Sequence, residues 1–265
     1  MRNVRFQVSY DGSLFFGWQR QDGFISVQEA IEDAVAAATG RTVVIHGAGR
    51  TDTGVHALRM VAHMHIDTGL SDDRLRHALN AHVREGIAIP KLETCRDDFH
   101  ARFDAVSKRY MYVVATSRFE PVFGRQLRHW TNHPLELEPM QQAARALVGK
   151  HDFKGFGNTG SPRKTTVRTV HRVRLVAYKE RVVFFIQADG FLYNMVRTIV
   201  GTLLDVGRGR RAADCVARTL ASGERVDAGA TAPARGLYFL SAQYDEPVFS
   251  GSDAAGHGHP GVFRL

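Results

Sequence analysis

The chain has 265 residues, of which 44% are hydrophobic and 23% are charged, and its formal net charge is +8; these are values of an ordinary globular protein, long enough for two medium domains or one large one. No apolar run reaches the roughly 20 residues of a membrane helix, and the first residues form no apolar signal region. Two cysteines, Cys95 and Cys215, supply neither a disulfide framework nor a zinc spacing, so we expect a reduced, cytoplasmic protein with no membrane partner.

The positive charge is concentrated in the middle of the chain. Residues 1–95 carry 10 basic and 11 acidic side chains, and residues 212–265 carry 4 and 6. Residues 96–211 carry 21 basic against 10 acidic side chains, a local excess of +11. Such an excess, mostly arginine, suits a polyphosphate partner. A basic surface kept for solubility is the alternative, so charge alone leaves nucleic-acid binding open.

The first half of the chain alternates predicted strands and helices. Residues 3–10 alternate apolar and polar side chains and predict a half-buried strand. A helix is predicted over 26–40, with a capping box formed by Ser26 and Glu29 and a stop at Gly40. Residues 41–46 resemble a strand, and a clear alternating strand covers 58–66. Residues 71–83 predict a helix capped by Ser71.

The second half repeats this mixture. A strand is predicted over 108–116 and a helix over 139–148. Residues 169–190 predict two strands joined at Lys179 and Glu180. Helices are predicted over the apolar stretch 190–207 and over 212–223. The order of elements therefore predicts an α+β protein of two related units, each an antiparallel sheet covered on one face by helices.

The stretch "GRTDTGVHA", residues 49–57, places one carboxylate, that of Asp52, in a loop between two predicted strands. Turn chemistry is the simplest interpretation, because Asp, Thr and Gly all favour loops. Two features favour a functional acid instead. Arg50 is close enough in sequence to keep the carboxylate ionised, and the flanking strands would give the loop a rigid frame.

"DTG" is also the active-site tripeptide of aspartic proteases, so a dimeric protease is one alternative. Those enzymes need two carboxylates that share one proton. The tripeptide occurs once here, so a second copy of the chain would have to supply the partner. A neighbouring arginine opposes the shared-proton state, and the Asp does not follow an apolar strand as it does in that class.

A third interpretation is a lone carboxylate that attacks an electron-poor carbon in RNA. It requires an aromatic side chain to stack a flipped-out base and arginines to place phosphates and the acid. Tyr110, which follows Lys108 and Arg109 in a predicted strand, is the aromatic candidate. Arg197 lies within a predicted buried helix, where a charge must be paired or reach a cleft. Asp52 is its natural partner.

His63 and His65 lie two residues apart in a predicted strand. A metal site would need a third ligand at readable spacing, and none is visible, which favours contact with solvent or RNA. No dinucleotide or P-loop fingerprint is found either. We therefore expect no metal and no cofactor.

Several motifs, in order and at fitting distances, resemble the tRNA pseudouridine synthase A family over residues 3–245. They are "YDGSLFFGWQRQ", "GAGRTDTGVHA", "FHARFDAVSKRYMY", "GKHDFKGF", "GFLYNMVRTIVGTLLDVGRG" and "APARGLYF". The family's catalytic aspartate in "GRTD" falls on Asp52 and its adjacent arginine on Arg50. Its active-site tyrosine falls on Tyr110, and its acid-pairing arginine on Arg197. One departure is Thr53, where alanine is common.

The resemblance implies two ferredoxin-like (RRM-like) halves whose antiparallel sheets meet at a central catalytic cleft. We expect these halves at 1–105 and 106–245, followed by a mobile tail at 246–265. The resemblance also implies a homodimer that binds tRNA, not DNA, and isomerises uridines 38 to 40 of the anticodon stem-loop without a cofactor. A non-catalytic RNA-binding module is the alternative from another class, although it gives no reason for an acid facing a phosphate backbone.

Overall fold

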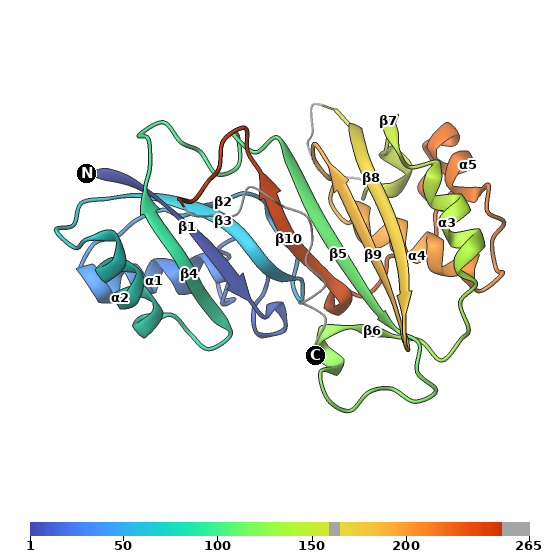
Figure 1. Ribbon diagram of the computed structural model, residues 1–265, viewed down its shortest axis with the longest axis horizontal. Coiled ribbons are helices and arrows are strands. Elements are labelled where there is room, and N and C mark those ends of the chain that lie inside the picture. Colours follow the sequence, from blue (N-terminus) through green and yellow to red (C-terminus); the bar gives the residue numbers. More distant parts are fainter. Residues whose placement is uncertain (159–164, 251–265) are drawn as a thin grey trace.

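The computed structural model describes residues 1–158 and 165–250 and confirms the α+β class (Figure 1). The strands are β1 (Arg2–Tyr10), β2 (His46–Gly47), β3 (His56–Ile66), β4 (Ile87–Thr94), β5 (Ser107–Ala115), β6 (His129–Trp130), β7 (Gly149–Asp152), β8 (Val167–Tyr178), β9 (Arg181–Ala188) and β10 (Leu237–Gln243). The α-helices are α1 (Val27–Thr39), α2 (Asp72–His82), α3 (Leu137–Arg145), α4 (Met195–Gly207) and α5 (Cys215–Ser222). Short 3-10 helices are η1 (Gly12–Leu14), η2 (Arg125–Leu127), η3 (Lys154–Phe156), η4 (Arg225–Asp227) and η5 (Ala234–Gly236). None of the helices in these ranges has the length and apolarity to cross a membrane.

Within the described residues the two halves share a single sheet. Its order is β4-β1-β3-β10-β5-β9-β8-β7, with β2 paired to β3 and β6 paired to β5. β10, the last strand in sequence, lies in the middle of the molecule between β3 and β5 (Figure 1). It pairs parallel with β3 and antiparallel with β5. The two expected sheets are thus joined edge to edge, and β10 forms the seam.

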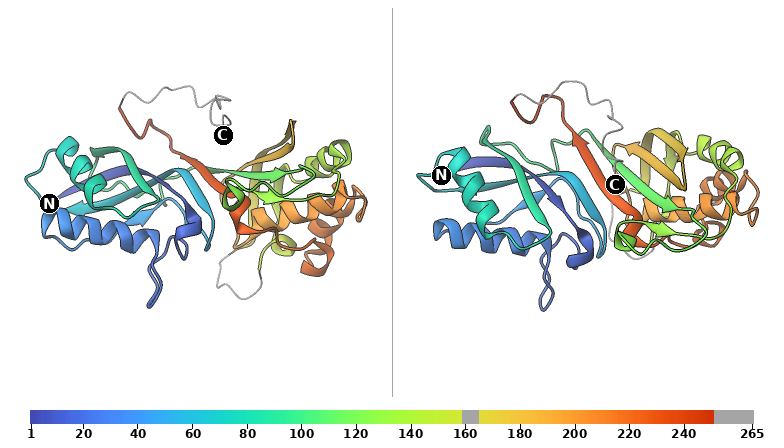
Figure 2. Two further views of the ribbon diagram at one scale, coloured as in Figure 1. Left: turned by 90° about the horizontal axis from the view of Figure 1, so that it is seen from below. Right: turned by 60° about the horizontal axis from the view of Figure 1, so that its bottom comes forward.

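One face of this sheet carries most of the core. Val4, Phe6 and Val8 of β1 point into it and are fully buried, as the alternation predicts. α1 begins with the predicted capping box of Ser26 and Glu29 and ends at Gly40. Figure 2 shows α1 and α4 on the same side of the sheet, at opposite ends of it. Helices of both halves contribute to one continuous hydrophobic cluster.

The prediction that a helix runs from residue 190 is wrong at its start. α4 begins at Met195, five residues later, because Asn194 takes a left-handed backbone conformation with φ of 60°. A non-glycine residue rarely adopts this conformation, and it breaks the helical path. As a result Arg197 lies in the first turn of α4 and not in its buried middle.

The predicted strand at 41–46 is also shorter than expected. Only His46 belongs to a strand there, although Val43 and Ile45 are buried. The backbone N–H of Ile45 donates to the carboxylate of Glu32 at 3.0 Å in place of a neighbouring strand. A side chain therefore satisfies a group that the sheet would otherwise pair.

The division into domains at residue 105 stays a prediction. Of the expected mobile tail, residues 251–265 lie outside the described residues. Its first part contacts the N-terminal half: Phe249 is buried, and Ser250 donates a backbone and a hydroxyl hydrogen bond to Glu93 at 2.8 and 2.7 Å.

The close packing of α4 against the backbone at Ala230 should contribute to the stability of the protein. A methyl group on Gly201 would lie 1.7 Å from the backbone oxygen of Ala230, whereas on Gly207 it would meet the flexible end of Met140. Gly201→Ala should therefore lower the free energy of unfolding by roughly 1–3 kcal/mol through overpacking, despite the better helix propensity of alanine. Urea unfolding checks this with Gly207→Ala as the matched control. A Gly201 variant as stable as the parent would contradict the packing.

Candidate active site

Asp52 lies in the loop between β2 and β3, and this loop is fixed from several sides. The backbone N–H of Val55 donates to the carbonyl of Asp52 at 3.1 Å, and that of Trp18 donates to the carbonyl of Thr51 at 3.0 Å. The hydroxyls of Tyr10 and Thr51 are 2.7 Å apart in a buried hydrogen bond. The loop therefore presents its acid from a rigid frame, as the flanking strands predict.

The predicted contact between Asp52 and Arg197 is present. Nη1 of Arg197 lies 3.3 Å from Oδ2 of Asp52, and both side chains are mostly buried. Nη1 also donates to the side-chain oxygen of Asn194 at 2.9 Å, and Nε donates to the carbonyl of Ala232 at 2.7 Å. Three acceptors thus fix the guanidinium. Because α4 begins at Met195, later than predicted, Asn194 lies just before the helix and within reach of Arg197, which the sequence pattern did not reveal.

Two opposing effects act on the Asp52 carboxyl. Burial raises its pKa above the ordinary value, and the charge and hydrogen bond of Arg197 lower it. Burial is the larger effect, so the net shift is upward. Arg197 limits this shift and favours the ionised form by a favourable charge interaction.

Arg50 does not hold the acid as expected. Its side chain is exposed, and it forms no hydrogen bond or ion pair with Asp52 among the residues that the structure describes. In an extended segment, residues two apart share a side but are separated by about 6–7 Å of chain. Arg197 of the other half supplies the charge that we expected from Arg50.

Tyr110 lies on β5 with its ring among aromatic neighbours. The edge contacts join it to Phe191 and Phe239, with ring centroids 4.9 and 5.3 Å away. Burial first, and then the negative charge of Asp52, raise the pKa of its hydroxyl. The hydroxyl is therefore protonated at neutral pH, so it can donate a hydrogen bond and is not a phenolate. Its place near Asp52 agrees with the expected pairing of acid and aromatic.

His56 is a functional candidate that we did not single out, although it belongs to the quoted loop motif. Its ring is buried and stacks on Tyr238, with centroids 4.7 Å apart. Nε2 lies 3.1 Å from the carbonyl oxygen of Gln126 and 3.2 Å from that of Arg235. On the other side Nδ1 accepts from the backbone N–H of Gly12 at 3.0 Å. His56 thus ties the Asp52 loop to the C-terminal half.

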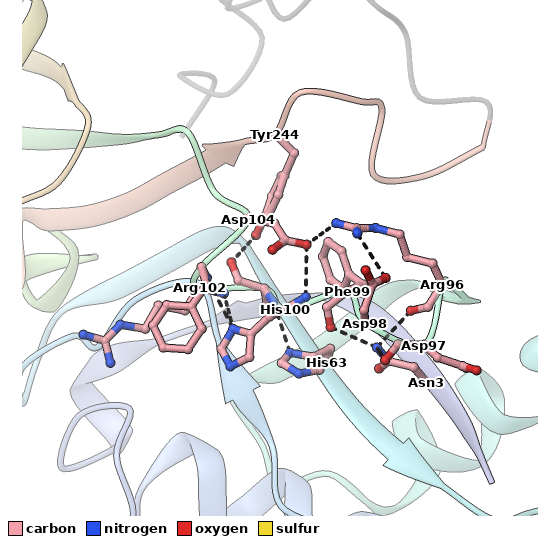
Figure 3. A network of polar contacts seen from close by, with 12 residues as sticks. Asn3, His63, Arg96, Asp97, Asp98, Phe99, His100, Arg102, Asp104 and Tyr244 are labelled. Atoms are coloured by element: carbon pink, nitrogen blue, oxygen red, sulfur yellow. Dashed lines mark hydrogen bonds and ion pairs between the residues drawn. The ribbon is translucent and has the colours of Figure 1, made fainter.

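His63 of β3 belongs to a network of polar contacts with the segment before β5 (Figure 3). His63 is buried against His46 and His100, with ring centroids 5.2 and 4.6 Å away, and its Nδ1 accepts from the backbone N–H of Ala101 at 3.2 Å. His65 is exposed. Across residues 1–158 and 165–250, no three His, Cys, Asp or Glu side chains are arranged to hold a metal ion.

The buried His63 should make the stability of the protein depend on pH. Burial, and then the neighbouring histidines, lower its pKa to about 4 from 6.5. Between these values the unfolded chain binds a proton that the folded protein does not, so stability is lost as pH falls from 6.5 towards 4. The loss from His63 should be on the order of 3 kcal/mol. Denaturant unfolding across this range checks it.

His63→Asn keeps an acceptor for Ala101 and removes the titrating ring, so its unfolding free energy should fall less steeply with acid. His65→Asn, on the exposed side of the same strand, is the matched control. Equal slopes for the parent and His63→Asn would contradict the assignment.

Comparisons with known proteins agree with this geometry. The family described as "tRNA pseudouridine synthase" matches residues 7–104 and 143–245. The tRNA pseudouridine synthase A of Acetivibrio thermocellus is 44% identical over 92% of this chain and all of its own length. That of Parvibaculum lavamentivorans is 39% identical with the same coverage.

Among solved structures, a Cbf5-Nop10-Gar1 complex is 12% identical, with a TM-score of 0.36, and the match covers 76% of this chain and 45% of that chain. The family match and the relatives cover most of the chain at substantial identity, and the predicted Asp–Arg contact is present within their span. The chain belongs to the tRNA pseudouridine synthase family.

Proposed function

We propose that this protein isomerises uridine to pseudouridine at positions 38 to 40 of the tRNA anticodon stem-loop, with Asp52 as the catalytic group. The contact that carries the proposal is the ion pair between Asp52 and Arg197. It joins an acid of the N-terminal half to a cation of the C-terminal half, at the seam of the sheet. A carboxylate held in this way is oriented, mostly buried and still reachable from solvent, as a reacting group must be.

The reaction exchanges one bond for another within the same nucleotide. The bond between N1 of uracil and C1′ of ribose breaks, the uracil turns, and a bond forms between C5 and C1′. The proton on C5 then leaves, and N1 gains one, so nothing is consumed. Asp52 can attack C1′, attack C6, or accept the 2′ proton to give a glycal. Each route starts from the ionised carboxylate, which Arg197 favours.

Tyr110 and Arg50 complete the proposed site. The Tyr110 ring is held by its aromatic neighbours, so it offers a fixed surface against the turning base. Its protonated hydroxyl can donate to the base and relay the proton from C5. Arg50 is exposed and lies two residues before Asp52, so its guanidinium suits a contact with the RNA near the displaced nucleotide.

The resemblance to the family supports a wider proposal about the partner, the assembly and the location. The proposed partner is tRNA rather than DNA, and the assembly is a homodimer in which each tRNA touches both subunits. Large apolar side chains on the loop between β5 and β6 support contact with a further surface: Phe119, Val122 and Phe123 are 75%, 80% and 89% exposed. The expected location is the cytoplasm, where tRNA is the abundant anticodon-bearing substrate.

The alternatives explain less of the geometry. A non-catalytic RNA-binding module has no use for a carboxylate held at the seam, because an acid weakens binding to a phosphate backbone. An aspartic protease needs a carboxyl that shares a proton with a second one. Arg197 opposes that shared state by favouring the charged form of Asp52.

Asp52→Asn should abolish pseudouridine formation and leave tRNA binding unchanged or tighter. The amide keeps the size of the side chain but can neither attack carbon nor accept the 2′ proton, and it removes a negative charge that faces the RNA. Pseudouridine is measured on unmodified tRNA, and affinity is measured separately.

Asp33→Asn removes an exposed carboxylate elsewhere and serves as the control with parental turnover. Measurable turnover by freshly purified, sequence-verified Asp52→Asn, free of deamidation, would overturn the role of Asp52.

A further inference from the structure

Several cations in the basic middle of the chain form ion pairs within the protein. Arg197 pairs with Asp52. Arg208 and Arg211, which end the basic stretch after α4, lie 3.9 and 3.5 Å from Asp205. Such pairs leave little charge for a partner. Cations with no acidic neighbour are therefore better suited to bind an anionic ligand.

Lys108 is a cation of this second kind. Its ammonium forms no hydrogen bond or ion pair with any residue that the structure describes. It lies on β5 two residues before Tyr110, so the alternation of the strand places both side chains on one face. Its neighbours across the ladder are Ala188 on β9 and Ala242 on β10. Both of these neighbours have small side chains.

The stem of Lys108 lies against the Asp52 loop. A methyl group built on Gly49 would be 4.0 Å from Cδ of Lys108 and 3.9 Å from the hydroxyl oxygen of Tyr110. Gly49 precedes Asp52 by three residues. Lys108 thus borders the same loop residue as the proposed base-stacking tyrosine, at the edge of the proposed site.

The charges of two more cations act on Lys108. Burial is the main cause that lowers its pKa to about 8, and the positive charges of Arg102 and Arg168 lower it further. Within residues 1–158 and 165–250, none of the three cations forms an ion pair with a carboxylate. Arg102, from the segment before β5, lies over the ring of Phe103, and in Figure 3 its guanidinium takes no part in the polar network. Among the described residues, the Arg168 side chain of β8 donates to the carbonyls of Thr165 and Val167.

Three like charges without a carboxylate repel one another in the free protein, and a bound anion would relieve this repulsion. A nucleotide that leaves its stack must have its backbone held beside the pocket. We propose that Lys108, with Arg102 and Arg168, binds an RNA phosphate group next to the target nucleotide. This assignment rests on the proposed function, because it takes RNA as the ligand of the same site.

The pH dependence of RNA binding isolates Lys108. Below pH 8 its ammonium is charged and binds phosphate, and above pH 8 the free protein loses this charge. The affinity of the parent for an anticodon-arm RNA should therefore fall as pH rises from 7 to 9.5. Lys108→Arg stays charged throughout and should show a smaller fall. The facing groups, Arg102, Arg168 and Tyr110, are the same in both proteins.

Lys108→Met should weaken RNA binding about tenfold at pH 7 and lower the salt dependence by about one phosphate contact. Lys154→Met removes a lysine that pairs with Glu224 and serves as the matched control with parental affinity. RNAs with one uncharged methylphosphonate on either side of the target uridine locate the contact. At one of the two linkages, the methylphosphonate should weaken RNA binding by the parent. The same methylphosphonate should cause no further loss of affinity in Lys108→Met.

Parental affinity and salt dependence in a folded Lys108→Met, or equal pH dependence in the parent and Lys108→Arg, would overturn the assignment. A methylphosphonate effect that is the same in the parent and in Lys108→Met at both linkages would also overturn it. Failure of the proposed function would give a different result. In that case the parent would bind RNA but form no pseudouridine, and the binding measurements on Lys108 could still be made.

Discussion

The ion pair between Asp52 and Arg197 is the interaction on which the rest of the account depends. Its two residues are 145 positions apart in sequence and 3.3 Å apart in space. Burial makes the charged carboxylate costly, and Arg197 offsets part of that cost. The carboxylate is therefore partly desolvated, while Arg197 favours its ionised form. Neither half of the chain could provide this alone.

The fold supplies the pair through the seam of the sheet. β10 follows the C-terminal helices in sequence and returns to lie between β3 and β5, which fixes the two halves side by side. The segment before β10 also locks the cation, because the carbonyl of Ala232 accepts from Nε of Arg197 and its N–H donates to the Arg197 carbonyl. His56 bonds across the same junction. The same group of contacts thus fixes the positions of both the acid and the cation.

Local patterns in the sequence predicted those parts of the structure that local physics decides. The capping box of α1, the alternation of β1 and the turn at Lys179 all depend on neighbouring residues, and all are found. The partnership of Asp52 and Arg197 was predictable because a buried charge demands an opposite one. The central place of β10 and the left-handed Asn194 were not, since long-range pairing and tertiary context leave no periodic signal. The same gap explains why Arg50, near in sequence, was expected in the role that Arg197 fills.

The most direct test is the pKa of the Asp52 carboxyl, measured by carbon-13 NMR titration of labelled aspartate in the parent and in Arg197→Met. Methionine fills similar space without the charge. The parent should titrate above the ordinary value of 3.8 because burial is the larger effect. Arg197→Met should titrate higher still, because the opposing charge is gone, while Arg197→Lys should stay closer to the parent. A parental pKa at or below 3.8, or one that is unchanged in a folded Arg197→Met, would contradict the account.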